Sequence, residues 1–105
     1  MPAYVISEVK VLDEDLIGRY RALAADSIAK YDGKYLVRAG ALELIEGKRD
    51  RDRQYIIVEF PSMARAREWY GSPEYAEALK VRHLGALDRT LVFIEGCGPR
   101  TRNIA

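Results

Sequence analysis

The sequence has 105 residues, of which 49% are hydrophobic and 31% are charged, the proportions of one ordinary soluble domain. Seventeen Lys and Arg against sixteen Asp and Glu give a formal net charge of +1, which creates no overall field toward nucleic acid or an anionic membrane. The single cysteine, Cys97, excludes an intrachain disulfide, and no stretch approaches the ~20 apolar residues that cross a bilayer. We expect one cytoplasmic domain over residues 1–105, with neither a nucleic-acid nor a membrane partner.

The first two elements are a strand and a long helix. Residues 3–11, AYVISEVKV, alternate apolar side chains in the manner of a half-buried strand. Residues 13–31 repeat apolar side chains at helical spacing, and the acidic start at 13–15 suits the positive end of the helix dipole. The repeating positions are Leu16, Ile17, Tyr20, Leu23, Ala24, Ser27, Ile28 and Tyr31. One face of this helix must be buried.

The middle of the chain indicates two strands joined by a polar loop. Asp32-Gly33 is a helix stop that tolerates positive φ. KYLVRAGALELIEG, residues 34–47, then predicts a strand with a bulge at Ala39-Gly40. The polar stretch GKRDRDRQ predicts a hairpin loop, and QYIIVEF, residues 54–60, predicts the most apolar strand.

Residues 62–87 predict a helix that begins twice. Ser62 can cap the run MARAREWY, which Gly71 ends, and Ser72 can cap a second helix with Pro73 at its first position. Two short helices with a bend between them leave a gap at the bend. The aromatic side chains Trp69, Tyr70 and Tyr75 would line or fill that gap.

TLVFIEG, residues 90–96, predicts the last strand, and residues 97–105 are expected to form a flexible tail. The order is βαββαβ, which is the ferredoxin-like α+β arrangement of an antiparallel sheet with both helices on one face.

The second face of this sheet is predicted to be apolar as well. One set, Val5, Val9, Ile56, Val58, Val92 and Ile94, can lie under the helices, and either assignment of the two sets leaves a second face rich in apolar groups. The opposite set would be Tyr4, Ile6, Tyr55, Ile57, Leu91 and Phe93, mixed with Glu8, Glu59 and Glu95. Soluble monomers rarely expose so many large apolar groups together, so the second face predicts a homodimer in which two sheets pack into an α/β barrel.

The sequence resembles a known family at four short stretches. YLVRAG at 35–40, VEFPS at 58–62, WYGSPEY at 69–75 and FIEG at 93–96 are similar to domain-of-unknown-function family 1330, within the dimeric α/β-barrel superfamily. This chain has Ala39-Gly40 where the family usually has two glycines after the arginine. The resemblance implies two ferredoxin-like subunits that pack sheet to sheet, and it implies no particular activity.

Several side chains are candidates for chemistry, each with a structural alternative. His83, the only histidine, is either a core or rim residue of its helix or an acid, base or ligand. Arg38 in mid-strand is either part of an ion pair with Glu8, Glu59 or Glu95, or a fork that holds a small carboxylate. No second His or Cys stands at ligand spacing, so we predict no metal and no cofactor.

These candidates lead to two hypotheses. The first is a cofactor-independent enzyme for proton transfer or oxygenation of a small organic acid or aromatic, with a pocket between the sheet and the broken helix. In it Arg38 orients the substrate, His83 or Glu59 moves the proton, and the aromatic side chains Trp69, Tyr70 and Tyr75 form the pocket wall. The second is a non-catalytic ligand-binding or stress-associated dimer that uses the same pocket.

Overall fold

The computed structural model of the chain describes residues 1–97. Its strands are β1 (Ala3–Val11), β2 (Lys34–Arg38), β3 (Gln54–Phe60) and β4 (Leu87–Glu95). Its helices are α1 (Glu14–Lys30), α2 (Met63–Tyr70) and α3 (Pro73–Val81), and a π-helical turn, Arg82–Ala86, follows α3. The predicted tail lies outside the described residues except for Cys97, which is exposed.

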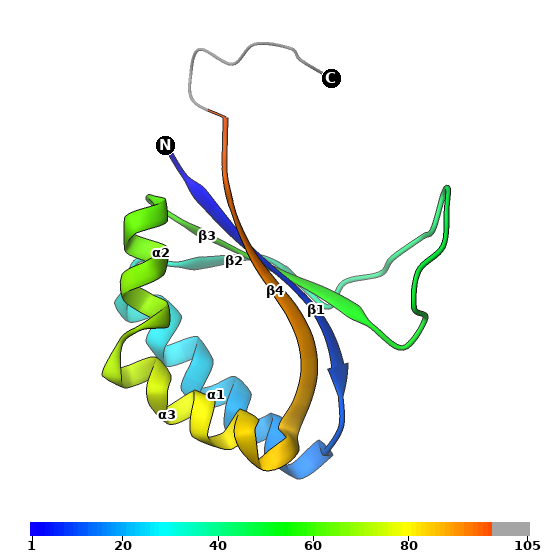
Figure 1. Cartoon of the computed structure of the whole chain (residues 1–105), viewed down its shortest axis with the longest axis horizontal. Helices are drawn as coiled ribbons and strands as arrows, with labels where there is room; N and C mark the ends of the chain where they lie inside the picture. Colours follow the sequence, from blue (N-terminus) through cyan, green and yellow to red (C-terminus); the bar gives the residue numbers. More distant parts are fainter. Residues whose placement is uncertain (98–105) are drawn as a thin grey trace.

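The four strands form one antiparallel sheet in the order β2-β3-β1-β4. Figure 1 shows α1, α2 and α3 on one side of this sheet, while no helix of residues 1–97 covers the opposite side. The predicted ferredoxin-like arrangement is therefore confirmed. Within residues 1–97, no helix has the length and apolar character needed to span a membrane.

Helix α1 begins where the acidic cluster predicts. The Asp13 carboxylate accepts hydrogen bonds from the backbone N–H groups of Asp15 and Leu16, at 3.0 and 2.9 Å. The buried face of the helix carries Ile17, Tyr20, Ala24, Ser27 and Ile28. Residues of this face and residues of β1 and β3 line one space between α1 and the sheet.

The double helix start is also confirmed. The Ser62 hydroxyl accepts from the backbone N–H of Arg65 at 3.0 Å, and the Ser72 hydroxyl accepts from that of Tyr75 at the same distance. Ser72 also donates to the Trp69 carbonyl at 2.7 Å, which joins the end of α2 to the start of α3. The bend lets two short helices follow a twisted sheet.

The predicted strand 34–47 is too long. Ladder pairing ends at Arg38, and residues 39–53 form an irregular excursion that Figure 1 shows extending well away from the helices. Ala39 has a φ of 56°, a left-handed value that ends the extended backbone. The bulge exists, but it lies between Tyr35 and Val37 rather than at Ala39-Gly40.

The face assignment is right for β1 and β3 and wrong for β4. Phe93 lies opposite Val5 and Leu91 lies opposite Ser7, so Leu91 and Phe93 face the helices while Val92 and Ile94 face away. Both alternating sets of residues in this strand include large apolar side chains, so only the pairing register decides which set faces the helices. The strand also begins at Leu87, earlier than predicted, because the π-helical turn ends there.

The uncovered face, which we call the open face, remains rich in apolar groups after this correction. It carries Tyr4, Ile6, Val37, Ile57, Val92 and Ile94. Val92 and Ile94 are 41% and 50% exposed.

Candidate functional site

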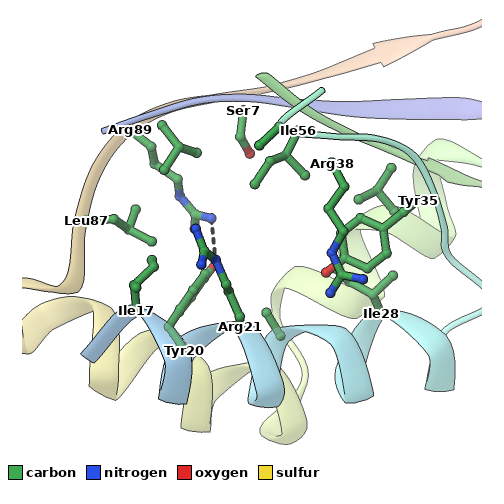
Figure 2. Close-up of a pocket in the computed structure, with 14 residues that line it drawn as sticks. Ser7, Ile17, Tyr20, Arg21, Ile28, Tyr35, Arg38, Ile56, Leu87 and Arg89 are labelled. Atoms are coloured by element: carbon green, nitrogen blue, oxygen red, sulfur yellow. Dashed lines mark hydrogen bonds between the residues drawn. The ribbon is translucent and has the colours of Figure 1, made fainter. Parts of the chain in front are cut away.

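A cavity of about 390 Å³ lies between α1 and the helix-facing side of the sheet. Figure 2 shows α1 along one wall, with side chains from the strands along the other. Most of the lining is apolar: Val9, Ile17, Ala24, Ile28, Ala39, Ile56, Val58 and Leu87. The polar lining groups are Ser7, Tyr20, Tyr35 and the three arginines Arg21, Arg38 and Arg89. An apolar chamber with a few convergent polar groups is the usual form of a small-molecule site.

Two tyrosines hold Arg89 at one side of the cavity. One terminal nitrogen of Arg89 donates to the Tyr20 hydroxyl at 2.6 Å, and the other donates to the Tyr75 hydroxyl at 2.5 Å. The two hydroxyl oxygens lie 2.6 Å apart. Three elements therefore meet here, since Tyr20 belongs to α1, Tyr75 to α3 and Arg89 to β4.

One of the two tyrosine hydroxyl hydrogens has no acceptor within this cluster. The two phenols carry two O–H hydrogens, and the bond between their oxygens uses one of them. Both oxygens already accept from Arg89, which has no acceptor to offer. Tyr75 is fully buried, whereas Tyr20 lines the cavity. If Tyr75 donates to Tyr20, the remaining hydrogen of Tyr20 is available to a ligand in the cavity.

Burial keeps the Tyr20 hydroxyl protonated. Removal from water and the proximity of Tyr75 raise the pKa of Tyr20 well above the ordinary tyrosine value, against the opposing effect of Arg89. Burial alone would lower the pKa of Arg89, but its contacts with Tyr20 and Tyr75 outweigh burial and raise it. At neutral pH the cluster therefore presents a cation and a hydrogen-bond donor.

Arg38 reaches the cavity because of the bulge in β2. Tyr35 lies opposite Val58 and Arg38 lies opposite Ile56, so both face the helices although three positions separate them. In a regular strand they would point to opposite faces. The guanidinium carbon of Arg38 lies 4.1 Å from the Tyr35 ring centroid, within the range of a cation–π contact.

The cavity carries positive charge without an acidic counterpart. Within residues 1–97, Arg21, Arg38 and Arg89 take no part in any ion pair with Asp or Glu. Figure 2 shows Arg21 on the same side of the cavity as Tyr20 and Arg89, with Arg38 and Tyr35 on the other side. The predicted ion pair between Arg38 and a glutamate is absent from this part of the chain.

The three predicted aromatics fill the helix bend, where they were expected to line or fill a gap. Trp69 is buried, donates its indole N–H to the Ser27 hydroxyl at 3.0 Å and packs beside Phe60. Tyr70 is partly exposed at the surface. Tyr75 touches the cavity only indirectly, through Tyr20 and Arg89. The cavity described above lies between α1 and the sheet and is not lined by these three aromatics, whose role as a pocket wall stays a prediction.

The structure does not bring His83 or Glu59 to the cavity. His83 is exposed in the π-helical turn. Glu59 lies on the open face, opposite Lys34 across the ladder, and its carboxylate is 3.1 Å from the Lys34 ammonium group. A catalytic role for either residue stays a prediction. In residues 1–97 no group of three His, Cys, Asp or Glu side chains is arranged to hold a metal.

The sequence reasoning missed Tyr20 and Arg89. Tyr20 was read as part of the apolar stripe, and Arg89 fell before the predicted start of the last strand. The available signal was the alternation Leu87, Arg89, Leu91, Phe93, in which a charge occupies one position of an apolar stripe.

The fold and the cavity define a small ferredoxin-like α+β domain with an arginine- and tyrosine-lined chamber. The chain belongs to the family described as domain of unknown function DUF1330, whose model matches residues 2–97. A comparison with curated protein sequences finds no match.

Solved structures share the fold at low sequence identity. A Rhodopseudomonas palustris protein of unknown function is 22% identical, with a TM-score of 0.70 over 93% of this chain and 84% of its own. A dimeric ferredoxin-like protein from Bacteroides fragilis is 17% identical, with a TM-score of 0.62 over 90% of this chain and 96% of its own. A cofactor-independent oxygenase from Streptomyces nogalater is 13% identical, with a TM-score of 0.60 over 96% and 98%.

Proposed function

We propose that this protein binds a small organic acid in the cavity between α1 and the sheet. The acidic group of the ligand is held by Arg89 and by the free hydrogen of Tyr20, and its apolar body lies against Ile28 and Ile56. This is the non-catalytic, ligand-binding hypothesis of the sequence analysis, with a different set of residues at its centre.

One observation carries the proposal: the Arg89 guanidinium is held by two phenols, lies beside an apolar cavity and has no carboxylate partner in residues 1–97. Arg89 is partly buried, so its charge loses part of its hydration without gaining a counter-ion, and an anionic ligand offsets that cost. Arginine suits this role because its guanidinium has five N–H donors, of which the two phenols use two, so others are available to a carboxylate.

A thermal-shift panel of aliphatic and aromatic carboxylates, each beside its neutral amide, tests the proposal. Carboxylates should raise the melting temperature and the amides should not. For the best acid, calorimetry on Tyr20→Phe and Arg89→Gln should give at least about tenfold weaker binding than wild type, the size expected for a lost charge-assisted hydrogen bond. Arg67→Gln, on an exposed position of α2, is the matched control. Equal stabilisation by acids and amides would contradict the proposal.

Arg38 requires a measurement of its own, because its guanidinium lies on the other side of the cavity. Arg38→Ala should weaken binding of acids that span the cavity. If Arg38→Ala and wild type bind every acid equally, Arg38 is not part of the site.

We also infer that the working protein is a cytoplasmic homodimer joined through the open face. The exposed side chains Val92 and Ile94 support this, and so do Leu42, Leu44 and Ile45, which are 40%, 51% and 82% exposed in the excursion between β2 and β3. Burial of such groups against a second copy is the common solution for an apolar sheet face. The Bacteroides fragilis protein of the same fold is described as dimeric.

Catalysis is the second candidate function, as cofactor-independent proton transfer or oxygenation of the bound acid. The fold likeness to the Streptomyces nogalater oxygenase motivates it, and Tyr20 could donate a proton or hydrogen bond to a developing oxyanion. Against proton abstraction, the cavity lining includes no His, Asp or Glu among the described residues. Binding without turnover therefore has the stronger support.

Two readouts separate catalysis from binding. Incubation of the best acid in D₂O, followed by NMR, should leave its α-hydrogens unexchanged if the protein only binds it. Oxygen consumption should likewise stay at the level of the protein-free control. Deuterium incorporation or oxygen uptake that disappears in Tyr20→Phe would establish the catalytic alternative.

A further inference from the structure

The two cationic centres of the cavity lie on opposite edges of the sheet. Arg38 lies opposite Ile56, which lies opposite Ser7, whereas Arg89 lies opposite Val9. From β2 to β4 the sheet has three interstrand steps of about 4.8 Å, and Ser7 and Val9 differ by a further ~7 Å along β1. The backbones of the two arginines are therefore separated by roughly 16 Å, and both side chains line the cavity between α1 and the sheet.

Each centre has contacts of its own, although Arg38 is more exposed to solvent than Arg89. The two tyrosine hydroxyls hold the guanidinium group of Arg89, and the Tyr35 ring supports that of Arg38. Because neither arginine contacts an acidic side chain in residues 1–97, both ends of the cavity carry uncompensated positive charge.

The wall between the two centres is apolar. Ile28 of α1 and Ile56 of β3 line it from the two sides, and Figure 2 shows the open space between the Tyr20–Arg89 side and the Tyr35–Arg38 side. A ligand with one acidic group would satisfy one centre and leave the other without a counter-ion. The volume of about 390 Å³ is that of a compact metabolite site, near the lower end of the usual range for small-molecule pockets.

We propose that the ligand is an organic dianion, a short dicarboxylate whose two acidic groups are joined by an apolar segment and bind Arg89 and Arg38 at opposite ends of the cavity. The inference rests on the organic-acid binding proposed above and narrows its ligand class. Tyr20 completes the Arg89 end as a hydrogen-bond donor, and the apolar segment packs between Ile28 and Ile56.

A chain-length series tests the inference by calorimetry at constant pH and low ionic strength. The probes are the linear α,ω-dicarboxylates from malonate to suberate, each beside the monocarboxylate of equal carbon number. Affinity should pass through a maximum at an intermediate length, where the dicarboxylate binds at least about tenfold tighter than its monocarboxylate. Arg38→Gln should reduce that ratio to about one, whereas Arg51→Gln, in the exposed loop, should leave it as in wild type.

The outcomes separate this inference from the proposal on which it rests. If monocarboxylates and dicarboxylates bind equally at every length, the dianion inference is overturned and the proposal of organic-acid binding remains. Binding of neither class would overturn both. A length optimum that persists in Arg38→Gln would also overturn the inference, because the second acidic group would then contact some other residue.

Discussion

The hydroxyl oxygens of Tyr20 and Tyr75 lie 2.6 Å apart, although 55 residues separate them in the chain, and Arg89 donates to both. These hydrogen bonds link α1 to α3 and hold the Arg89 side chain at the cavity. The same three side chains therefore serve stability and the proposed binding, and the two effects can be measured separately.

Tyr75→Phe and Tyr20→Phe should each lower the free energy of unfolding by about 1–3 kcal/mol, because each removes a buried acceptor of Arg89. The double variant should lose less than the sum of the two, since both single variants break the shared hydrogen bond. Urea unfolding at constant protein concentration measures all three. Tyr70→Phe, a partly exposed tyrosine of α2, is the control and should change stability by under ~0.5 kcal/mol. Fully additive losses would show that the two hydroxyls act independently.

The loss of folding stability at acidic pH should depend on Glu74. Hydrogen bonds from Lys30, at 2.7 Å, and from Tyr31, also at 2.7 Å, lower the pKa of this carboxyl from 4.5 to about 2. A carboxyl with a lowered folded-state pKa stabilises the protein above pH 4.5, and this contribution disappears as the pH falls toward 2. At pH 6 the melting temperature of Glu74→Gln should therefore be lower than that of wild type. The two melting temperatures should converge between pH 4.5 and 2. Glu46→Gln, in the exposed loop, is the control, and a constant difference for Glu74→Gln across this range would contradict the assignment.

Ala39→Gly should stabilise the protein. Ala39 adopts a φ of 56°, a left-handed conformation that costs an L-residue about 1–2 kcal/mol and costs glycine almost nothing. After subtraction of the greater freedom of glycine in the unfolded chain, we expect a gain of about 0.5–1 kcal/mol in thermal or urea unfolding. Ala41→Gly, in the same excursion but without positive φ, should give no gain. Destabilisation by Ala39→Gly would mean that its methyl group packs usefully at the edge of the cavity.

The open face should control the oligomeric state. Wild type should sediment at about 24 kDa, twice the chain mass of 11.9 kDa, and Val92→Lys should dissociate toward the monomer because the new charge would have to be desolvated in the interface. Circular dichroism should show an intact fold, since Val92 is 41% exposed in the single chain. Leu84→Lys, exposed in the π-helical turn away from the sheet face, should remain dimeric. A wild-type monomer at micromolar concentration would refute the packing inference.

The element order was predictable because local chemistry decides it. Ser62, Ser72 and Asp13 cap helices through contacts with their own neighbours in sequence, and the alternation of β1 divides its residues between two faces. The face of β4 was not predictable. Both of its parities are apolar, so the choice depends on pairing with β1 and not on the strand itself.

The candidate site was predictable only in part. Arg38 was selected as a mid-strand charge, and it does line the cavity, but it does so because a bulge between Tyr35 and Val37 turns it to the helix side. Tyr20 and Arg89 escaped selection since their roles depend on contacts across 55 and 69 residues. His83 and Glu59 were chosen for chemical type, and the fold places them elsewhere.

The location of the ligand is the central claim, and intermolecular NOEs test it most directly. The protein should be labelled at its Ile, Leu and Val methyl groups and saturated with the tightest-binding acid of the panel. We predict NOEs from the aliphatic or aromatic protons of the acid to the methyl groups of Ile28, Ile56 and Leu87. NOEs to Val92 and Ile94 on the open face, without any to the three cavity residues, would contradict the account.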